Sequence, residues 1–163
     1  MAGDVRAAEP ADFEPLADLW FEQWNAAHAA LVPSALTALR TLADFRRRLL
    51  EYEDRLHVVG PVGAPLGFYV LKGHELDQIY VAPSVQGTGV AQMLLSNAEA
   101  RIAAVGHDTA MLVCTKGNER AQRFYRRNGW KLARTDVAML DTSDGPFAME
   151  ADIFEKVVGG PVS

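Results

Sequence analysis

The feature that most constrains this chain is a glycine-bearing turn between a predicted strand and a predicted amphipathic helix. Residues 76–81 form a strand-like run, and apolar side chains recur at helical spacing over residues 89–105. Such a turn brings free backbone N–H groups to the positive end of the helix, and its glycines allow close approach. The arrangement predicts an anion site, usually for phosphate, formed by Gln86, Gly87, Thr88, Gly89, Val90 and Ala91.

Three kinds of phosphate site use a turn of this kind. A P-loop needs a Gly-Lys-Ser/Thr ending, whereas Val90 and Ala91 follow Gly89 here. A dinucleotide fingerprint needs a third glycine where Gln92 stands, and it belongs in a βαβ unit, whereas hairpin strands precede this turn. A site for the pyrophosphate of coenzyme A remains open, as does a purely structural turn.

The other periodic segments predict a layered α/β domain. A short strand at 5–8 precedes a helix that Asp12 caps, and a second helix is expected from Ser34 to about Arg55. Strands are expected at 56–60, 66–71, 109–115, 130–140 and 147–157, with a helix between Asn118 and Asn128. This order places helices on a central mixed sheet in a single domain of residues 1–158, followed by a flexible tail at 159–163.

Composition narrows the class of partner and the compartment. The formal net charge is -5, whereas a duplex-binding protein presents a cationic face, so we expect no nucleic-acid partner. No apolar stretch approaches the ~20 residues that span a bilayer, and no signal peptide is visible. We therefore expect a soluble, cytoplasmic protein with no membrane partner. The single cysteine, Cys114, excludes a cysteine zinc cluster, and we expect no metal site; its apolar neighbours favour a core residue over a nucleophile.

A second motif follows the strand at 109–115. Asn118 precedes a helix in which Ala121, Phe124 and Tyr125 share one face. Side chains lean toward the N-terminus of a helix, so Tyr125 is expected to reach back toward the end of the preceding strand.

The two motifs, in this order, resemble those of the GNAT N-acetyltransferase superfamily. Gln86-x-x-Gly89-x-Ala91 is similar to its coenzyme A motif, and Asn118-x-x-Ala121-x-x-Phe124-Tyr125-x-x-x-Gly129-Trp130 is similar to its second motif. The motifs lie within residues 75–130, and the flanking order of elements also resembles the family. The resemblance implies a mixed, mostly antiparallel central sheet of six to seven strands flanked by about four helices.

The resemblance further implies acetyl-coenzyme A as cosubstrate, held in a V-shaped opening between the strands at 76–81 and 110–115. Pantetheine would form hydrogen bonds with backbone groups near Ile79, Tyr80 and Val81, as a neighbouring strand would. The pyrophosphate would lie on the amides of residues 86–91, and Asn118 and Tyr125 would contact the cosubstrate from the second motif.

The implied reaction is N-acetyl transfer to a primary amine of a small molecule or peptide, by direct attack in a ternary complex. A phenol is protonated at neutral pH, so Tyr125 is the candidate acid for the leaving thiolate, with a packed aromatic as the alternative. A backbone N–H near Val81 can stabilise the oxyanion. An alkylammonium must lose a proton before attack; Glu75 is the first candidate base, and Asp77, His74 and water stay open. Glu75 and Asp77 share a strand face unless a bulge intervenes.

Other residues bear on the acceptor and on assembly. Trp20, Trp24 and His28 recur along the first helix and, with Glu75 and Asp77, are candidates for substrate contact, although a packed core has the same spacing. The basic run at 46–48 is expected to be a solvated helix face, with a phosphate contact as the alternative. An exposed last strand could pair two subunits, which leaves a homodimer open.

Two functions compete with acetyl transfer. A catalytically silent acyl-coenzyme A binding or sensor module would share the fold and the anion site, but the intact Asn118 and Tyr125 favour the enzyme. A nicotinamide-dependent oxidoreductase is disfavoured by the missing third glycine.

Overall fold

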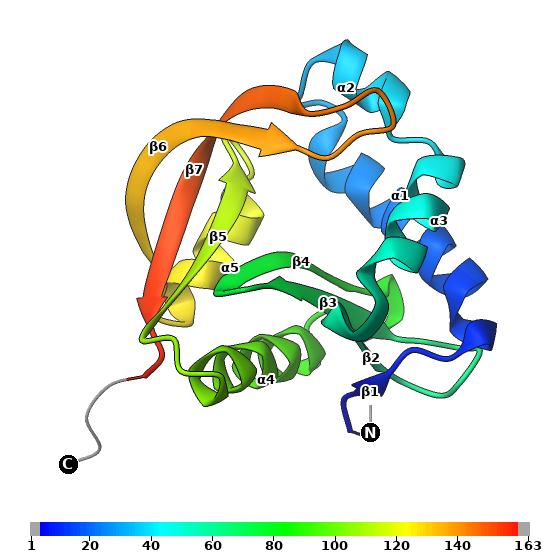
Figure 1. The fold of residues 1–163 in the computed structure, drawn as a ribbon, viewed down its shortest axis with the longest axis horizontal. Coiled ribbons are helices and arrows are strands. Elements are labelled where there is room, and N and C mark those ends of the chain that lie inside the picture. Colours follow the sequence, from blue (N-terminus) through cyan, green and yellow to red (C-terminus); the bar gives the residue numbers. More distant parts are fainter. Residues whose placement is uncertain (1–3, 160–163) are drawn as a thin grey trace.

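Seven strands form one sheet in the computed structural model, which describes residues 4–159 (Figure 1). They are β1 (Arg6–Ala7), β2 (Leu56–Val59), β3 (Gly67–Lys72), β4 (Glu75–Val81), β5 (Thr109–Thr115), β6 (Lys131–Leu140) and β7 (Phe147–Val157). Their order across the sheet is β1-β2-β3-β4-β5-β7-β6. Among these pairs β4 and β5 run parallel and all others antiparallel, which confirms the predicted mixed, mostly antiparallel sheet.

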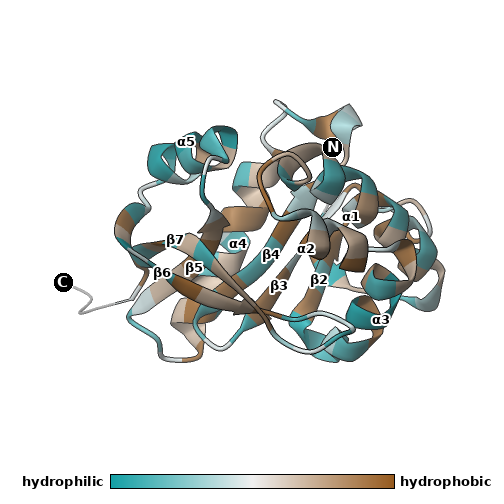
Figure 2. Cartoon of the chain, turned by 90° about the horizontal axis from the view of Figure 1, so that it is seen from above, coloured by the Kyte–Doolittle hydropathy of each residue, from teal (hydrophilic) through white to brown (hydrophobic). Residues whose placement is uncertain are grey.

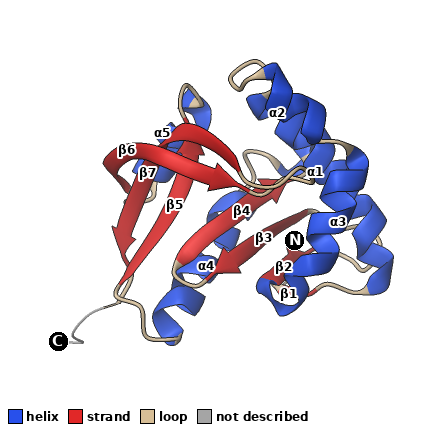
Figure 3. Cartoon of the chain, turned by 45° about the horizontal axis from the view of Figure 1, so that its top comes forward, coloured by secondary structure: helices blue, strands red, loops and turns tan. Residues whose placement is uncertain are grey.

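Five α-helices among the described residues cover the two faces of the sheet (Figure 3). They are α1 (Phe13–His28), α2 (Ser34–Leu39), α3 (Leu42–Tyr52), α4 (Val90–Ala104) and α5 (Glu119–Arg127). The first three share a core with β2 and β3, whereas α4 shares a second core with β5 on the opposite face. Figure 2 shows α5 as a mostly hydrophilic helix, and none of its residues is fully buried. None of the helices in residues 4–159 is long and apolar enough to cross a bilayer.

Strand β3 shows why the sheet needs a layer of helices on each side. Phe68 and Val70 point into the core that contains α1 and α3, whereas Tyr69 points into the core that contains α4. All three side chains are fully buried. Successive residues of a strand face opposite sides, so a strand that is apolar throughout is stable only when both faces are covered.

The sheet splits between β4 and β5. Glu75 and Met111 form the pair between them, and the Met111 N–H donates to the His74 carbonyl oxygen at 3.0 Å. Beyond this point the two strands diverge (Figure 3). β4 is bonded to β3 on its other side, with a bulge at Asp77, and its edge toward β5 is unpaired along most of its length. The structure thus contains the V-shaped opening that the resemblance implied.

Two predictions about helix ends are wrong. The segment from Ser34 to Arg55 is two helices, because Arg40 leaves the helical region at φ -89° and ψ 62°, and the Thr41 side chain accepts the Asp44 N–H to cap α3. A Thr-x-x-Asp start was present in the sequence as a signal. Asp12 does not cap α1 through its side chain; its carboxylate accepts from the Arg6 guanidinium and from two backbone N–H groups.

The last strand lies inside the sheet. β7 is bonded to β5 on one side and to β6 on the other, so β6 is the edge strand and the expectation that the last strand has an exposed edge is wrong. At the C-terminal end the Gly159 N–H donates to the Asp108 carbonyl oxygen at 3.1 Å, so the predicted tail does not begin there as a free segment. The rest of that tail, 160–163, lies outside the described residues.

Candidate active site

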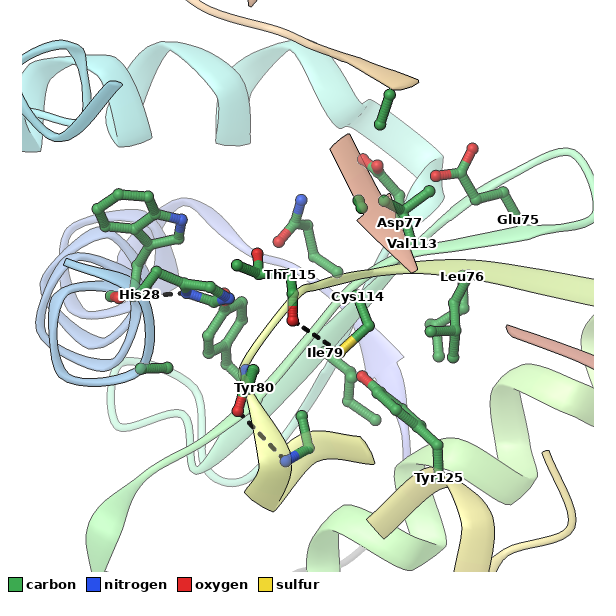
Figure 4. A pocket seen from close by; sticks show the side chains of 18 of the residues that line it. His28, Glu75, Leu76, Asp77, Ile79, Tyr80, Val113, Cys114, Thr115 and Tyr125 are labelled. Atoms are coloured by element: carbon green, nitrogen blue, oxygen red, sulfur yellow. Dashed lines mark hydrogen bonds between the residues drawn. The ribbon is translucent and has the colours of Figure 1, made fainter. Parts of the chain in front are cut away.

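A cavity of about 1380 Å³ occupies the split between β4 and β5 and extends toward α1 and α3. One end is bordered by the glycine turn before α4, and α5 and β6 contribute to its walls. Figure 4 shows side chains from β4, β5, α1 and α5 that reach into it. The sites predicted from the two motifs therefore share one cavity.

The glycine turn has the geometry of an anion site. Gly87 and Gly89 have φ values of +77° and +93°, which favour glycine, and a Cβ at either position would meet nothing within 4 Å. In the described part of the chain the N–H groups of Gly87, Gly89, Val90 and Ala91 have no protein acceptor. These free donors lie at the positive end of the 15-residue helix α4.

The polar side chains of this turn have structural partners. The Gln86 amide donates to Gln23 of α1 and accepts from Arg120 of α5, each at 3.1 Å, so it ties the turn to two walls of the cavity. The Thr88 hydroxyl donates to the Val85 carbonyl oxygen and closes the turn on itself. These side chains are therefore engaged within the protein, which leaves the backbone N–H groups for the predicted phosphate.

The second motif places a phenol at the cavity. The Asn118 side chain accepts the Ala121 N–H at 3.3 Å and caps α5, as expected for this position. The ring of Tyr125 packs 6.2 Å from those of Trp130 and Phe154, and its hydroxyl points toward Cys114 and Ile79 (Figure 4). None of the hydrogen bonds within residues 4–159 involves this hydroxyl. Burial raises the pKa of Tyr125, so the phenol keeps its proton at neutral pH.

The three residues predicted to bind pantetheine differ in where their side chains go. Ile79 and Val81 pack against the core on the α4 side, whereas Tyr80 packs against the core on the α1 side. All three line the cavity. Their backbone is bonded to β3 through pairs such as Gly67↔Val81, which leaves the edge toward β5 for a ligand.

Two carboxylates lie together at the narrow end of the split, although a bulge interrupts the strand between them. The register of β4 against β3 slips so that Asp77 has no partner, and Glu75 and Asp77 point the same way (Figure 4). Burial and the neighbouring Asp77 raise the pKa of Glu75 to about 6. Burial also raises the pKa of Asp77, an effect that the positive charge of Arg48 partly offsets. His74, in contrast, does not line the cavity and lies 5.7 Å from the His107 ring.

The residues of α1 divide between core and cavity. Trp20 is fully buried against Phe45 and Phe68 and does not line the cavity, so its predicted substrate contact is wrong. Trp24 and His28 do line the cavity, stacked 5.3 Å apart. Burial lowers the pKa of His28, which favours a neutral imidazole.

Two arginines in the wall were not predicted as site residues. Arg40 and Arg48 are each 4% exposed and line the cavity. The expectation that the basic run at 46–48 is a solvated helix face holds for Arg46, whose side chain is 44% exposed, and fails for Arg48. The sequence contains a signal for the burial of Arg48, because this residue lies three positions after Phe45 on the apolar stripe of α3.

The single cysteine is not an activated nucleophile. Burial and the charge of Asp152 raise the pKa of Cys114 to about 12, so the thiol is neutral at physiological pH. Within residues 4–159, no three His, Cys, Asp or Glu side chains are placed to hold a metal ion.

Sequence comparison decides the family. A sequence model of the acetyltransferase (GNAT) family matches residues 13–130, which is most of the chain. The chain belongs to this family. The acetyltransferase is 26% identical over 138 residues to the peptidyl-lysine N-acetyltransferase YjaB of Escherichia coli, covering 84% of this chain and 88% of YjaB. It is 38% identical over 119 residues to an uncharacterised N-acetyltransferase of Mycobacterium tuberculosis, covering 69% of this chain and 72% of that protein.

Solved structures share the fold of this acetyltransferase. The apo form of YjaB superposes with a TM-score of 0.69 at 25% identity, covering 96% of this chain and 98% of YjaB. PaiA N-acetyltransferase of Thermoplasma acidophilum, in complex with coenzyme A, has a TM-score of 0.70 at 20% identity, covering 94% of this chain and 98% of PaiA. As a member of this family, the chain is an acetyl-coenzyme A-dependent acetyltransferase.

Proposed function

We propose that this protein transfers the acetyl group of acetyl-coenzyme A to a primary amine of a small molecule or peptide by direct attack in a ternary complex. The observation that carries the proposal is the split between β4 and β5, which joins the unbonded N–H groups of the glycine turn to the free phenol of Tyr125 in one cavity. The similarity to YjaB supports the inclusion of lysine peptides among the candidate acceptors.

The residues present fit the cosubstrate. The free N–H groups of Gly87, Gly89, Val90 and Ala91 are donors for the pyrophosphate, and the glycines leave space for its approach. The unpaired edge of β4 has backbone donors and acceptors for the two amides of pantetheine. This route leads from the turn into the split, toward Tyr125.

The chemical step needs three groups. The ammonium of the acceptor first loses a proton to Glu75 or to water, and the neutral amine attacks the thioester carbonyl carbon. A backbone N–H near Val81 stabilises the oxyanion that forms. As the C–S bond breaks, Tyr125 donates its proton to the leaving thiolate and is reprotonated from solvent, while the amide nitrogen loses its second proton. The products are the N-acetyl amide, the free thiol and one proton.

A thiol-release screen tests the reaction. Purified protein is incubated with acetyl-coenzyme A and a panel of polyamines, amino acids, aminoglycosides, lysine peptides and peptide N-termini. We expect amine-dependent thiol release at least 10-fold above hydrolysis for one class, with the N-acetyl product visible by mass spectrometry. Tight binding of acetyl-coenzyme A with no release for any amine would instead indicate a silent binding module.

The pH dependence tests Glu75 as the base. A base must be ionised, so kcat/KM should fall below about pH 6 as Glu75 gains a proton. Protonation of the amine also lowers kcat/KM as the pH falls, but less steeply, and the decrease due to Glu75 adds to it. In Glu75→Gln only the loss due to the amine should remain, and the rate above pH 7 should be reduced. An unchanged pH profile in the variant would leave water or Asp77 as the proton acceptor.

The Glu75 carboxyl should also make the stability of the protein depend on pH. The pKa of Glu75 in the folded state, about 6, exceeds its ordinary value of 4.5, so the folded protein favours the protonated form. Stability is therefore lost as pH rises from about 4.5 through 6. Glu75→Gln should have a higher Tm than the natural protein at pH 7.5, and the difference should vanish near pH 4. An equal Tm at both pH values would contradict the burial of this carboxyl.

A further inference from the structure

The wall of the cavity that α3 forms contains a buried guanidinium that lacks a counter-ion within hydrogen-bond distance. Arg48 is 4% exposed, its Nε has no hydrogen-bond partner, and its ion pair with Asp141 has an N–O distance of 3.9 Å. This distance exceeds that of a hydrogen bond. Asp141 is itself 57% exposed and lies 3.5 Å from Arg47, so its charge is shared and partly solvated. A buried charge without a close partner is costly, and such groups concentrate at binding sites.

Aromatic rings hold Arg48 in place without neutralising it. Its guanidinium carbon lies 4.4 Å from the centroid of the Trp20 ring and 5.9 Å from that of Phe45. These contacts are cation–π interactions, which supply no hydrogen-bond acceptor. The Tyr52 hydroxyl also faces Arg48 but carries no charge, so the N–H groups of Arg48 keep the capacity to bind an anion in the cavity that the side chain lines.

Arg40 adds a second buried cation to the same wall. It donates to Asp44 at 3.1 Å and to the Asp141 carbonyl oxygen, and its Nε has no partner. Burial lowers the pKa of Arg40, and the charge of Arg48 lowers it further, so the two guanidiniums are close enough to repel each other. Asp44 does not balance both, because it also binds Arg47 at 2.7 Å.

The carboxylates of β4 bring the opposite charge into the same cavity, close to Arg48. Glu75 and Asp77 lie at the narrow end of the split, and the charge of Arg48 acts on Asp77 from α3. Lys72, Arg55 and Glu51 also line this region, and the Tyr52 hydroxyl faces Arg48 and Asp77. A ligand with an ammonium group and an anionic group would match both the carboxylates and the guanidiniums.

We propose that the acceptor is a small amine that also carries a carboxylate, and that Arg48, supported by Arg40, binds this carboxylate. The inference rests on the proposed acetyl transfer, since the amine is then the group that Glu75 deprotonates. Guanidinium and carboxylate form paired, charge-assisted hydrogen bonds, and the planar fork of arginine suits them better than lysine does. Arg48 is thus the residue that determines acceptor specificity.

Matched acceptors test the proposal in the natural protein. Each amino acid of a panel of α- and ω-amino acids is compared with its carboxamide, which has the same shape and no charge. We expect at least one amino acid whose kcat/KM exceeds that of its carboxamide by about 10-fold or more, after correction for the fraction of neutral amine. If acetyl transfer occurs but every carboxamide is used as well as its acid, the proposal is overturned.

Variants assign the preference to Arg48. Arg48→Met keeps an apolar stem over Trp20 and should reduce the ratio of acid to carboxamide to near one. Arg48→Lys should retain part of the preference for the acid over the carboxamide. Arg46→Met removes a neighbouring, 44% exposed arginine of the same helix and should keep the full ratio. Melting temperature and coenzyme A affinity are measured for each variant to exclude misfolding, and an intact ratio in folded Arg48→Met would overturn the assignment.

A binding experiment separates this inference from the proposed function. With coenzyme A present, the preferred amino acid should raise the Tm of the natural protein, whereas its carboxamide and the Arg48→Met variant should show no shift. If no amine releases thiol but this pattern holds, acetyl transfer is wrong and the carboxylate site stands. If no amino acid of the panel raises the Tm, the carboxylate site is wrong.

Discussion

Replacing Tyr125 with phenylalanine should lower kcat at least 100-fold while the affinity for acetyl-coenzyme A changes little. General acid catalysis typically contributes 10²–10⁴-fold, and the Tyr125 hydroxyl has no partner within the described residues that would give it a structural role. Phenylalanine keeps the ring contacts with Trp130 and Phe154, so the fold should be retained. Thiol release at saturating substrates measures kcat, and isothermal titration measures the affinity.

Tyr69→Phe is a matched control for this experiment. It also removes one phenol, whose hydroxyl donates to Asn97 on the α4 side of the sheet. This variant should lose some stability and keep its kcat, because the hydroxyl is outside the cavity. A kcat for Tyr125→Phe within threefold of the natural value would remove Tyr125 from the mechanism.

Gly89→Glu should weaken acetyl-coenzyme A binding at least 100-fold. The substitution places a carboxylate beside the N–H groups that are the proposed donors for the pyrophosphate, and charge-assisted hydrogen bonds contribute about 1.5–3 kcal/mol each. It also forces a side chain into φ +93°, which costs about 1–2 kcal/mol. In a melting experiment, ligand at ~100 times the natural Kd should stabilise the natural protein by about 2.7 kcal/mol and the variant by far less.

Gly106→Glu is a control that separates the effect of Gly89→Glu on binding from the effects of backbone strain and added charge. Gly106 has a φ of +101°, and a Cβ at this position would meet nothing within 4 Å, so the strain and the added charge are similar in the two variants. It follows the C-terminal end of α4, a helix length away from the turn. This control should be destabilised at least as much, because a carboxylate at the C-terminal end of a helix is unfavourable, yet it should bind acetyl-coenzyme A normally. Normal affinity in Gly89→Glu would contradict the phosphate assignment.

Local signals accounted for the parts of the site that the sequence predicted. The glycine turn and the Asn118 cap depend on residues within a few positions of one another, so their geometry can be inferred from the chain itself. The opening beside β4 followed from the family resemblance and was found where expected.

Nonlocal contacts account for the parts that were missed. Arg48 is buried because Trp20 of α1 and the segment at Asp141 cover it, and no local pattern specifies what will pack on a helix face. The break at Arg40 was hidden because the apolar stripe of Leu39, Leu42 and Phe45 continues across it at helical spacing. The order of the last two strands depends on a crossover, which no local pattern specifies, so the place of β7 inside the sheet does not follow from the sequence.

The split in the sheet has a consequence for solubility. An unpaired strand edge at a protein surface invites other chains to pair with it, and proteins usually shield such edges with charges, bulges or covering segments. Here the free edge of β4 is recessed between two halves of one sheet, with a bulge at Asp77 beside its closed end. The fold thereby keeps the unpaired backbone donors and acceptors of β4 inside the cavity, where a ligand can meet them, instead of at an outer edge of the sheet.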